Sequence, residues 1–209
     1  MNETTALALI VQILAGVSLA ACCGLRAFLP PFVVGLAVRV GVVDFVLGQP
    51  VQLNPAFEWL SATPALVIFG VAVIVEMLAD KIPVVDHILD VVETVIRPLA
   101  GLLVVAATLK GLAPLPAVVL GLLLGGSVAG GVHLAKSHIR VLSTLGTGGL
   151  GSPVLSMVED LAALAGSLLA VFASVIAVLL ILAGVVLTFR LVHRFRSRAG
   201  RIEKDLHPF

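Results

Sequence analysis

Residues 75–101 read VEMLADKIPVVDHILDVVETVIRPLAG and hold the main group of acidic residues in an otherwise apolar chain. Glu76 and Asp80 are four residues apart, so they share one face of a helix. Further along, Asp86 and Asp90 continue a polar stripe at helical spacing, and apolar residues fill the other side. The pattern fits an amphipathic helix at a membrane surface, or a helix whose polar stripe faces a cavity between membrane helices.

The composition of the 209-residue chain is that of an integral membrane protein. Hydrophobic residues make up 60% of the chain and charged residues 12%, and the mean hydropathy is +1.19. A domain that folds in water could not keep its surface polar with this composition. At about 20 residues per span there is room for roughly five to seven crossings, embedded in a lipid bilayer. No basic patch with aromatic residues is present, so binding to nucleic acid is not expected.

Apolar runs separated by short breaks predict an all-α polytopic fold with about six transmembrane helices. We expect residues 1–192 to form one transmembrane domain and residues 193–209 a basic tail. The positive-inside rule places this tail on the cytoplasmic side of the cell membrane. The breaks are expected at residues 25–31, 48–63, 80–97, 110–116 and 136–158.

Because successive spans reverse direction, the first, third and fifth breaks meet on one side of the membrane. Charge at membrane depth is costly unless it is paired or hydrated. We therefore expect re-entrant or amphipathic segments around a polar cavity that binds an ion or a solute. Its candidate residues are Arg26, Glu76, Asp80, Lys81, Asp86, Asp90, Arg97, Lys136, Arg140, Glu159 and Asp160.

The favoured function is passage of a small ion or solute, with a cation or a proton preferred. Carboxylate oxygens suit hard cations, and a bound cation is the one cofactor that the pattern suggests. The basic residues of the cavity would act as counter-charges, and Glu93 has the spacing of an ion pair with Arg97. The candidate cation ligands are Glu76, Asp80, Asp86 and Asp90.

Two alternatives stay open. In the first, a membrane-embedded enzyme or binder acts on a lipid headgroup, whose phosphate Arg26, Lys136 and Arg140 would hold while a carboxylate performs acid–base chemistry. In the second, the chain is a structural membrane subunit whose charges pair off completely. No sequence pattern of a Ser-His-Asp nucleophile is present.

Small residues at a spacing of four recur in the span predicted at residues 117–135. This spacing lets two membrane helices approach closely, within one chain or between copies in a homo-oligomer. The residues concerned are Gly121, Gly125, Gly126 and Gly130.

An internal duplication is suggested by a short repeated pattern. The pattern G-x-S-x-A begins at Gly16 and again at Gly125, and each copy is followed by a leucine, Leu25 and Leu134. Many transporters are built from such repeats.

A glycine-rich loop is predicted at residues 143–152, ahead of a helix that opens at Pro153. Ser156 and Glu159 have the spacing of a capping box at the start of that helix. The loop also matches G-x-G-x-x-G, but no strand precedes it, so nucleotide binding is not expected.

Four motifs taken together resemble one family. The chain is similar to the domain-of-unknown-function family numbered 4126, small bacterial multi-pass membrane proteins. The resemblance implies a polytopic membrane fold and brings no assigned activity, and its motif residues coincide with the converging charges. The motifs are GLRAFLPPF at 24–32, E-x3-DKIP-x2-D-x3-D at 76–90, RPLAG at 97–101 and SP-x2-S-x2-ED at 152–160.

Overall fold

The computed structural model describes residues 3–42, 50–80, 83–147 and 152–172, together with residues 183–184, 186–187 and 190. Side chains are described from residue 6 onward, except those of residues 83–90, 141–147 and 152–153 within the helices. The chain divides into two units, Met1–Val178 and Leu179–Phe209, and all of the named helices lie in the first unit.

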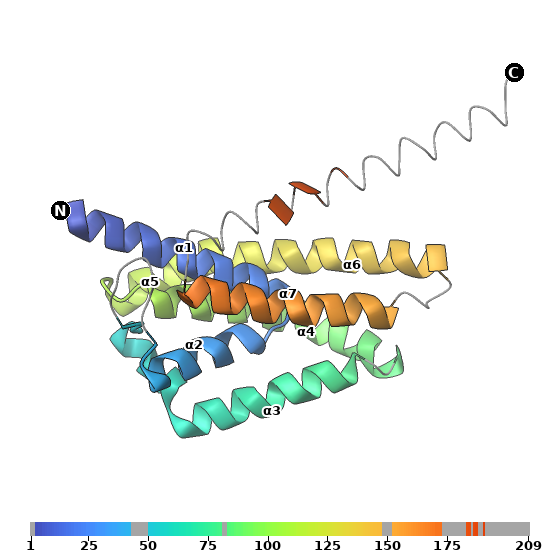
Figure 1. The fold of residues 1–209 in the computed structure, drawn as a ribbon, viewed down its shortest axis with the longest axis horizontal. Helices are drawn as coiled ribbons and strands as arrows, with labels where there is room; N and C mark the ends of the chain where they lie inside the picture. Colours follow the sequence, from blue (N-terminus) through green and yellow to red (C-terminus); the bar gives the residue numbers. More distant parts are fainter. Residues whose placement is uncertain are drawn as a thin grey trace, which may run out of the picture. The chain divides into compact units, whose positions relative to one another are not determined.

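Every named element in the described part of the chain is a helix (Figure 1). Helices α1, α3 and α6 run in one direction, and α2, α4 and α7 run in the opposite direction (Figure 1). The elements are α1 (Glu3–Leu25), α2 (Leu29–Val40), the 3-10 helix η1 (Pro55–Ser61), α3 (Thr63–Ala79), α4 (Pro83–Thr108), α5 (Pro114–Leu120), the π-helix η2 (Gly121–Gly126), α6 (Ser127–Thr147) and α7 (Ser152–Phe172).

The described residues contain the helices of a multi-pass membrane protein. A further crossing is present if η1 and α3, which meet at an angle of 62°, count as one bent span. Helix α2 is apolar, but its 12 residues extend only about 18 Å, which is short of a hydrocarbon core of about 30 Å. The four helices that are long and apolar enough to cross are Ala6–Leu25, Val91–Thr108, Pro114–Arg140 and Val154–Phe172.

Two predicted breaks are instead helical. A break was predicted at residues 80–97, but helix α4 begins at Pro83 and runs through these residues without interruption. Pro98 lies in its interior. The amphipathic stretch and the apolar run after it are therefore one helix, and their prediction as separate segments is wrong. Helix α6 likewise continues past residue 136 to Thr147. A polar stripe on one face of each helix lets it carry charges without ending.

Helix α1 lies at the centre of the first unit, packed against α4, α6 and α7. Its buried side chains Leu19 and Cys23 belong to one apolar core with Val104 and Val105 of α4. Cys22 is also buried, and both thiols are free. The two copies of the G-x-S-x-A pattern differ in outcome, because α1 ends at Leu25 whereas α6 continues beyond the matching leucine.

The glycines of the span that begins at α5 bring its backbone into contact with α4. A Cβ added at Gly125 would lie 2.1 Å from the carbonyl oxygen of Gly101, and one at Gly121 would lie 2.6 Å from that of Leu102. At Gly126 and Gly130 the nearest atoms, both of Pro98, would be 3.5 Å away, an ordinary contact. This face therefore packs on a helix of the same chain, while a homo-oligomer through these glycines stays a prediction.

We expect Gly125→Ala to lower the free energy of unfolding by about 1–3 kcal/mol, because the new methyl group would push η2 away from α4. Thermal unfolding of the purified protein in detergent measures the effect. Gly131→Ala is the matched control, since a Cβ there meets nothing within 4 Å. Equal melting temperatures for the two variants would contradict the close backbone contact.

Candidate functional site

A break between α1 and α2 sets the position of the candidate site. Helix α1 ends at Leu25, and α2 begins at Leu29 with prolines in its first turn. Proline has no N–H and fits the start of a helix but not the continuation of one. The break therefore exposes carbonyl groups at the end of α1 and N–H groups at the start of α2. Inside an apolar bundle such groups must find partners within the protein.

Charged side chains from three other helices satisfy these backbone groups. The N–H groups of Ala27 and Phe28 donate to the carboxylate of Glu76 on α3, at 2.9 and 3.3 Å. Lys136 Nζ on α6 donates to the Leu25 carbonyl at 3.1 Å. Arg97 on α4 donates to the carbonyl of Gly24, the residue before Leu25, at 3.1 Å. An anion thus lies at the positive end of α2 and cations lie at the negative end of α1, as the helix dipoles favour.

Arg26, within the break, is completely buried and joins α3 to α7. Its Nη1 lies 2.5 Å from Asp80 Oδ2, and its Nε lies 2.5 Å from Asp160 Oδ1. Its Nη2 donates to Ser156 Oγ at 2.9 Å. A buried guanidinium is stable only when its charge and its donors are matched in this way.

Two cations of α6 extend the same group of ion pairs. Glu159 Oε2 lies 3.0 Å from Lys136 Nζ and 3.2 Å from Arg140 Nη2. Arg140 Nη2 also lies 3.1 Å from Asp80 Oδ2. Burial raises the pKa of the Asp80 carboxyl, but the surrounding cations, with Arg26 the strongest, outweigh burial and hold that pKa below its usual value.

Arg97 forms a second centre on α4. It is completely buried, donates to Glu93 Oε2, and lies 4.0 Å from Glu76 Oε1. Its Nη1 donates to His133 Nδ1 at 2.7 Å. Because a guanidinium can only donate, Nδ1 must accept, so the ring is neutral and its proton is on Nε2, 3.3 Å from Thr94 Oγ1. The ion pair between residues 93 and 97 that the sequence predicted is formed.

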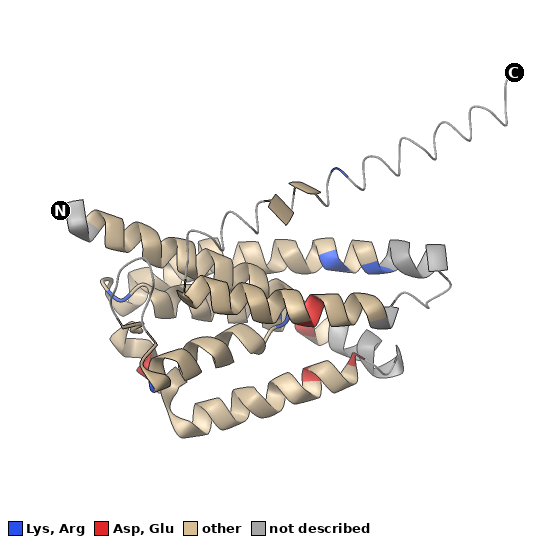
Figure 2. Ribbon diagram, viewed as in Figure 1, with Lys and Arg blue, Asp and Glu red and all other residues tan. Residues whose placement is uncertain are grey.

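We call this set of side chains around the α1–α2 break the charge network. Figure 2 shows acidic and basic residues together toward one end of α3, α6 and α7. Lys81, Asp86 and Asp90 lie outside the described side chains. The candidate residues that the structure brings together are Arg26, Glu76, Asp80, Arg97, Lys136, Arg140, Glu159 and Asp160.

The comparison with protein families identifies the chain. A family model described as "Domain of unknown function (DUF4126)" matches residues 13–194. The chain belongs to this family. Neither the curated proteins nor the solved structures gave a match. The residues that match DUF4126 include every member of the charge network.

Four further residues of the DUF4126 chain join the network although they were not among the predicted site residues. Ser156 and Glu159 do not form a capping box, because α7 begins at Ser152 and both side chains point to cations instead. His133 contacts Arg97, and Thr94 contacts His133; both contacts depend on the rotation of α4 and α6 about their axes. The four residues are Glu93, Thr94, His133 and Ser156.

The sequence predicted a cation site of four carboxylates, and the structure describes the side chains of two of them, Glu76 and Asp80. These two do not form a cation site. Glu76 accepts backbone N–H groups, and Asp80 contacts Arg26 and Arg140. Across the described ranges, no three His, Cys, Asp or Glu residues are placed to hold a metal ion. The oxygens of Glu76 and Asp80 are therefore already engaged by protein donors.

A buried asparagine fixes the opposite end of the bundle. Asn54 Nδ2 donates to the carbonyls of Leu109 and Leu112, each at 2.8 Å, and its Oδ1 accepts from the Ala56 N–H at 3.1 Å. The sequence predicted only a loop here. The pair Asn54–Pro55 is nevertheless a helix-start signal, with a capping side chain before a proline.

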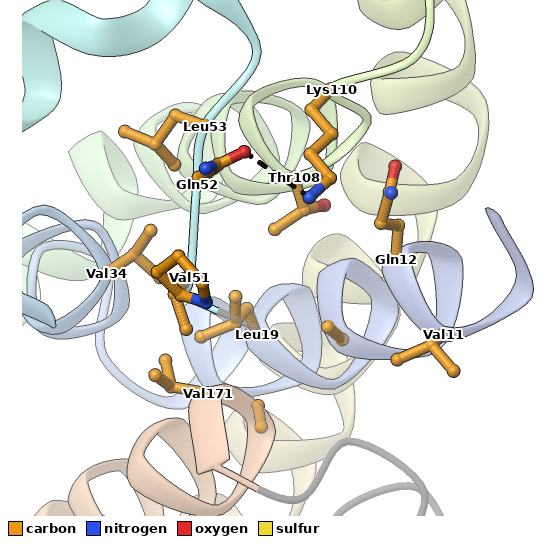
Figure 3. Close-up of a pocket in the computed structure, with 13 residues that line it drawn as sticks. Val11, Gln12, Leu19, Val34, Val51, Gln52, Leu53, Thr108, Lys110 and Val171 are labelled. Atoms are coloured by element: carbon orange, nitrogen blue, oxygen red, sulfur yellow. Dashed lines mark hydrogen bonds between the residues drawn. The ribbon is translucent and has the colours of Figure 1, made fainter. Parts of the chain in front are cut away.

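A pocket of about 60 Å³ lies near this end, between α1, residues 50–53 and the ends of α4 and α7 (Figure 3). Its walls are mostly apolar, with Gln12, Gln52, Thr108 and Lys110 as polar members. Lys110 Nζ donates to Gln52 Oε1 at 3.5 Å. Since Gln12 is about 20 Å along the helix axis from the end of α1, the pocket is separate from the charge network.

We expect Glu76→Ala to lower the free energy of unfolding by about 1–3 kcal/mol, because the N–H groups of Ala27 and Phe28 lose their buried acceptor. Thermal unfolding in detergent measures this. Glu58→Ala removes an exposed carboxylate on η1 and should change stability little. A melting temperature of Glu76→Ala equal to that of Glu58→Ala would show that the break does not depend on this carboxylate.

Proposed function

We propose that this DUF4126 protein carries a proton or a small cation across a membrane, and that the charge network is its ion-responsive site. Ionisable residues within membrane-spanning helices are rare and are associated with ion pathways and proton relays. Interrupted helices, whose ends offer free backbone groups, form the ion and substrate sites of many transporters. The break between α1 and α2 combines both features.

The observation that carries this proposal is an excess of negative charge. Five carboxylates face four cations among the described side chains of the network, so one negative charge is left over when His133 is neutral. The carboxylates are Glu76, Asp80, Glu93, Glu159 and Asp160, and the cations are Arg26, Arg97, Lys136 and Arg140. An unmatched buried charge is strongly unfavourable, and a bound proton or cation would neutralise it.

The same observation separates the proposal from its two rivals. A structural subunit would have its charges pair off completely, whereas the described carboxylates of the network outnumber its described cations by one. A lipid phosphate would need free basic groups, but Arg26 contacts two carboxylates, and Lys136 contacts Glu159 and the Leu25 carbonyl. Binding a phosphate would require these ion pairs to open.

For the topology, we propose six passages through the membrane region in alternating directions, with α2 as a short segment after the break. Both termini would then lie on one side, and the basic tail favours the cytoplasmic side of the cell membrane. Reporter fusions before Asn2 and after Leu206 should both report a cytoplasmic location. Opposite locations would contradict six passages.

Transport itself can be tested with purified protein in phospholipid vesicles. We expect measurable flux of protons or of one member of a panel of monovalent and divalent cations. Asp80→Asn should lower this flux roughly tenfold or more, the effect of about 1.4 kcal/mol of lost interaction, because it removes the excess negative charge. Glu58→Gln, which changes an exposed carboxylate outside the network, should leave the flux unchanged.

Size-exclusion chromatography and thermal unfolding establish that each variant is folded. No flux with any cation, together with binding of anionic phospholipid that is lost in Arg26→Gln, would contradict transport and support the headgroup alternative.

A further inference from the structure

The carboxylates of the charge network differ in how well their negative charge is matched. Glu76 accepts two backbone N–H groups at the start of α2. Asp80 lies beside Arg26 and Arg140, and Glu159 lies beside Lys136 and Arg140. Two donors or two cations per carboxylate stabilise the ionised form of all three.

Asp160 has one cation, and its Oδ1 is buried without a hydrogen bond in the described part of the chain, but another part of its side chain is open to water. Its Oδ1 lies 2.5 Å from Arg26 Nε, and 20% of its side chain is exposed. Partial hydration supplements the single ion pair, so a negative charge on Asp160 is tolerated.

Among the described side chains, Glu93 contacts one cation, and it is closed to water. Its side chain is 2% exposed, and Arg97 is its ion-pair partner through Oε2. The other oxygen, Oε1, is buried and makes no hydrogen bond within the described part of the chain. Arg97 also divides its donors among His133 and the Gly24 carbonyl. An ionised carboxylate with a buried, unbonded oxygen is costly.

The charged groups that the structure describes around Glu93 do not supply the missing positive charge. Arg97 on its own helix and Lys136 on α6 are the cations that act on it, and Glu76 and Asp80 from α3 are the carboxylates. His133, also on α6, is neutral because it accepts from Arg97. These described groups are two cations and two carboxylates, so they hold no excess of positive charge to match the carboxylate of Glu93.

We propose that a proton binds at Oε1 of Glu93, so that the ion served by the charge network is a proton rather than a metal cation. The inference rests on the proposed transport function and names its substrate. The proton passes from water to Oε1, which becomes a hydroxyl group. The network then has four ionised carboxylates against four cations, and its excess charge is gone. Release of the proton to water restores one negative charge.

Infrared difference spectra of the reconstituted protein, recorded between acid and alkaline pH, test the site directly. We expect a carbonyl stretching band of a protonated carboxylic acid that shifts in D₂O and is lost in Glu93→Gln. Glutamine has the shape of a protonated glutamate, so this variant should fold and melt close to the wild type. Glu93→Asp, which keeps an acid at this position, should shift the band rather than remove it.

Glu159→Gln is the matched control. Glu159 is also a buried glutamate of the network, but it contacts two cations, so its replacement should leave the band in place. Persistence of the band in Glu93→Gln, or its loss in Glu159→Gln, would overturn the assignment.

Proton flux into vesicles separates this inference from the transport proposal. In Glu93→Gln we expect proton flux to fall roughly tenfold or more and to lose its dependence on pH. If wild-type flux and pH dependence persist in that variant, transport stands and the proton site is wrong. If the wild type shows no flux of any ion while the Glu93 band is present, the site stands and transport is wrong.

Discussion

The structure depends on the interruption between α1 and α2, inside an apolar bundle that offers backbone groups no water. Backbone groups on both sides of the break are bonded by side chains of three other helices: Glu76 of α3, Arg97 of α4 and Lys136 of α6. Arg26, which lies within the break, connects it to α7 through an ion pair with Asp160. The charges that make the sequence unusual are therefore also what holds the interrupted helix together.

The sequence was sufficient to predict that these charges converge, because convergence follows from hydropathy and from the alternation of spans. It was not sufficient to predict their partners, which depend on the rotation and depth of each helix. The pairing of Arg97 with His133 illustrates this, as does the backbone contact between Gly101 and Gly125. Pro98 was misleading for a related reason, since an interior proline is tolerated where neighbouring helices support the backbone.

The network also shows why residue type alone could not separate structural from functional carboxylates. Glu76, Asp80 and Glu159 were predicted as ion-binding residues, and each is occupied by protein donors or cations. Glu93 was not among the predicted ion-binding residues, yet among the described carboxylates it is the one that the fold leaves least satisfied. What distinguishes a candidate ion site here is incomplete pairing, which a sequence does not display.

The two kinds of contact in the bundle respond differently to a proton. Glycine contacts between α4 and η2 do not depend on charge and keep those segments together. Helix α3 buries only Glu76 and Ala79, so its attachment at this end depends on ion pairs and on the bonds of Glu76. Arg97 lies between Glu93 and Glu76. A proton on Glu93 would weaken the attraction between Glu93 and Arg97 and leave the attraction between Arg97 and Glu76. The charge of Glu93 on α4 would then act on α3 through the guanidinium of Arg97.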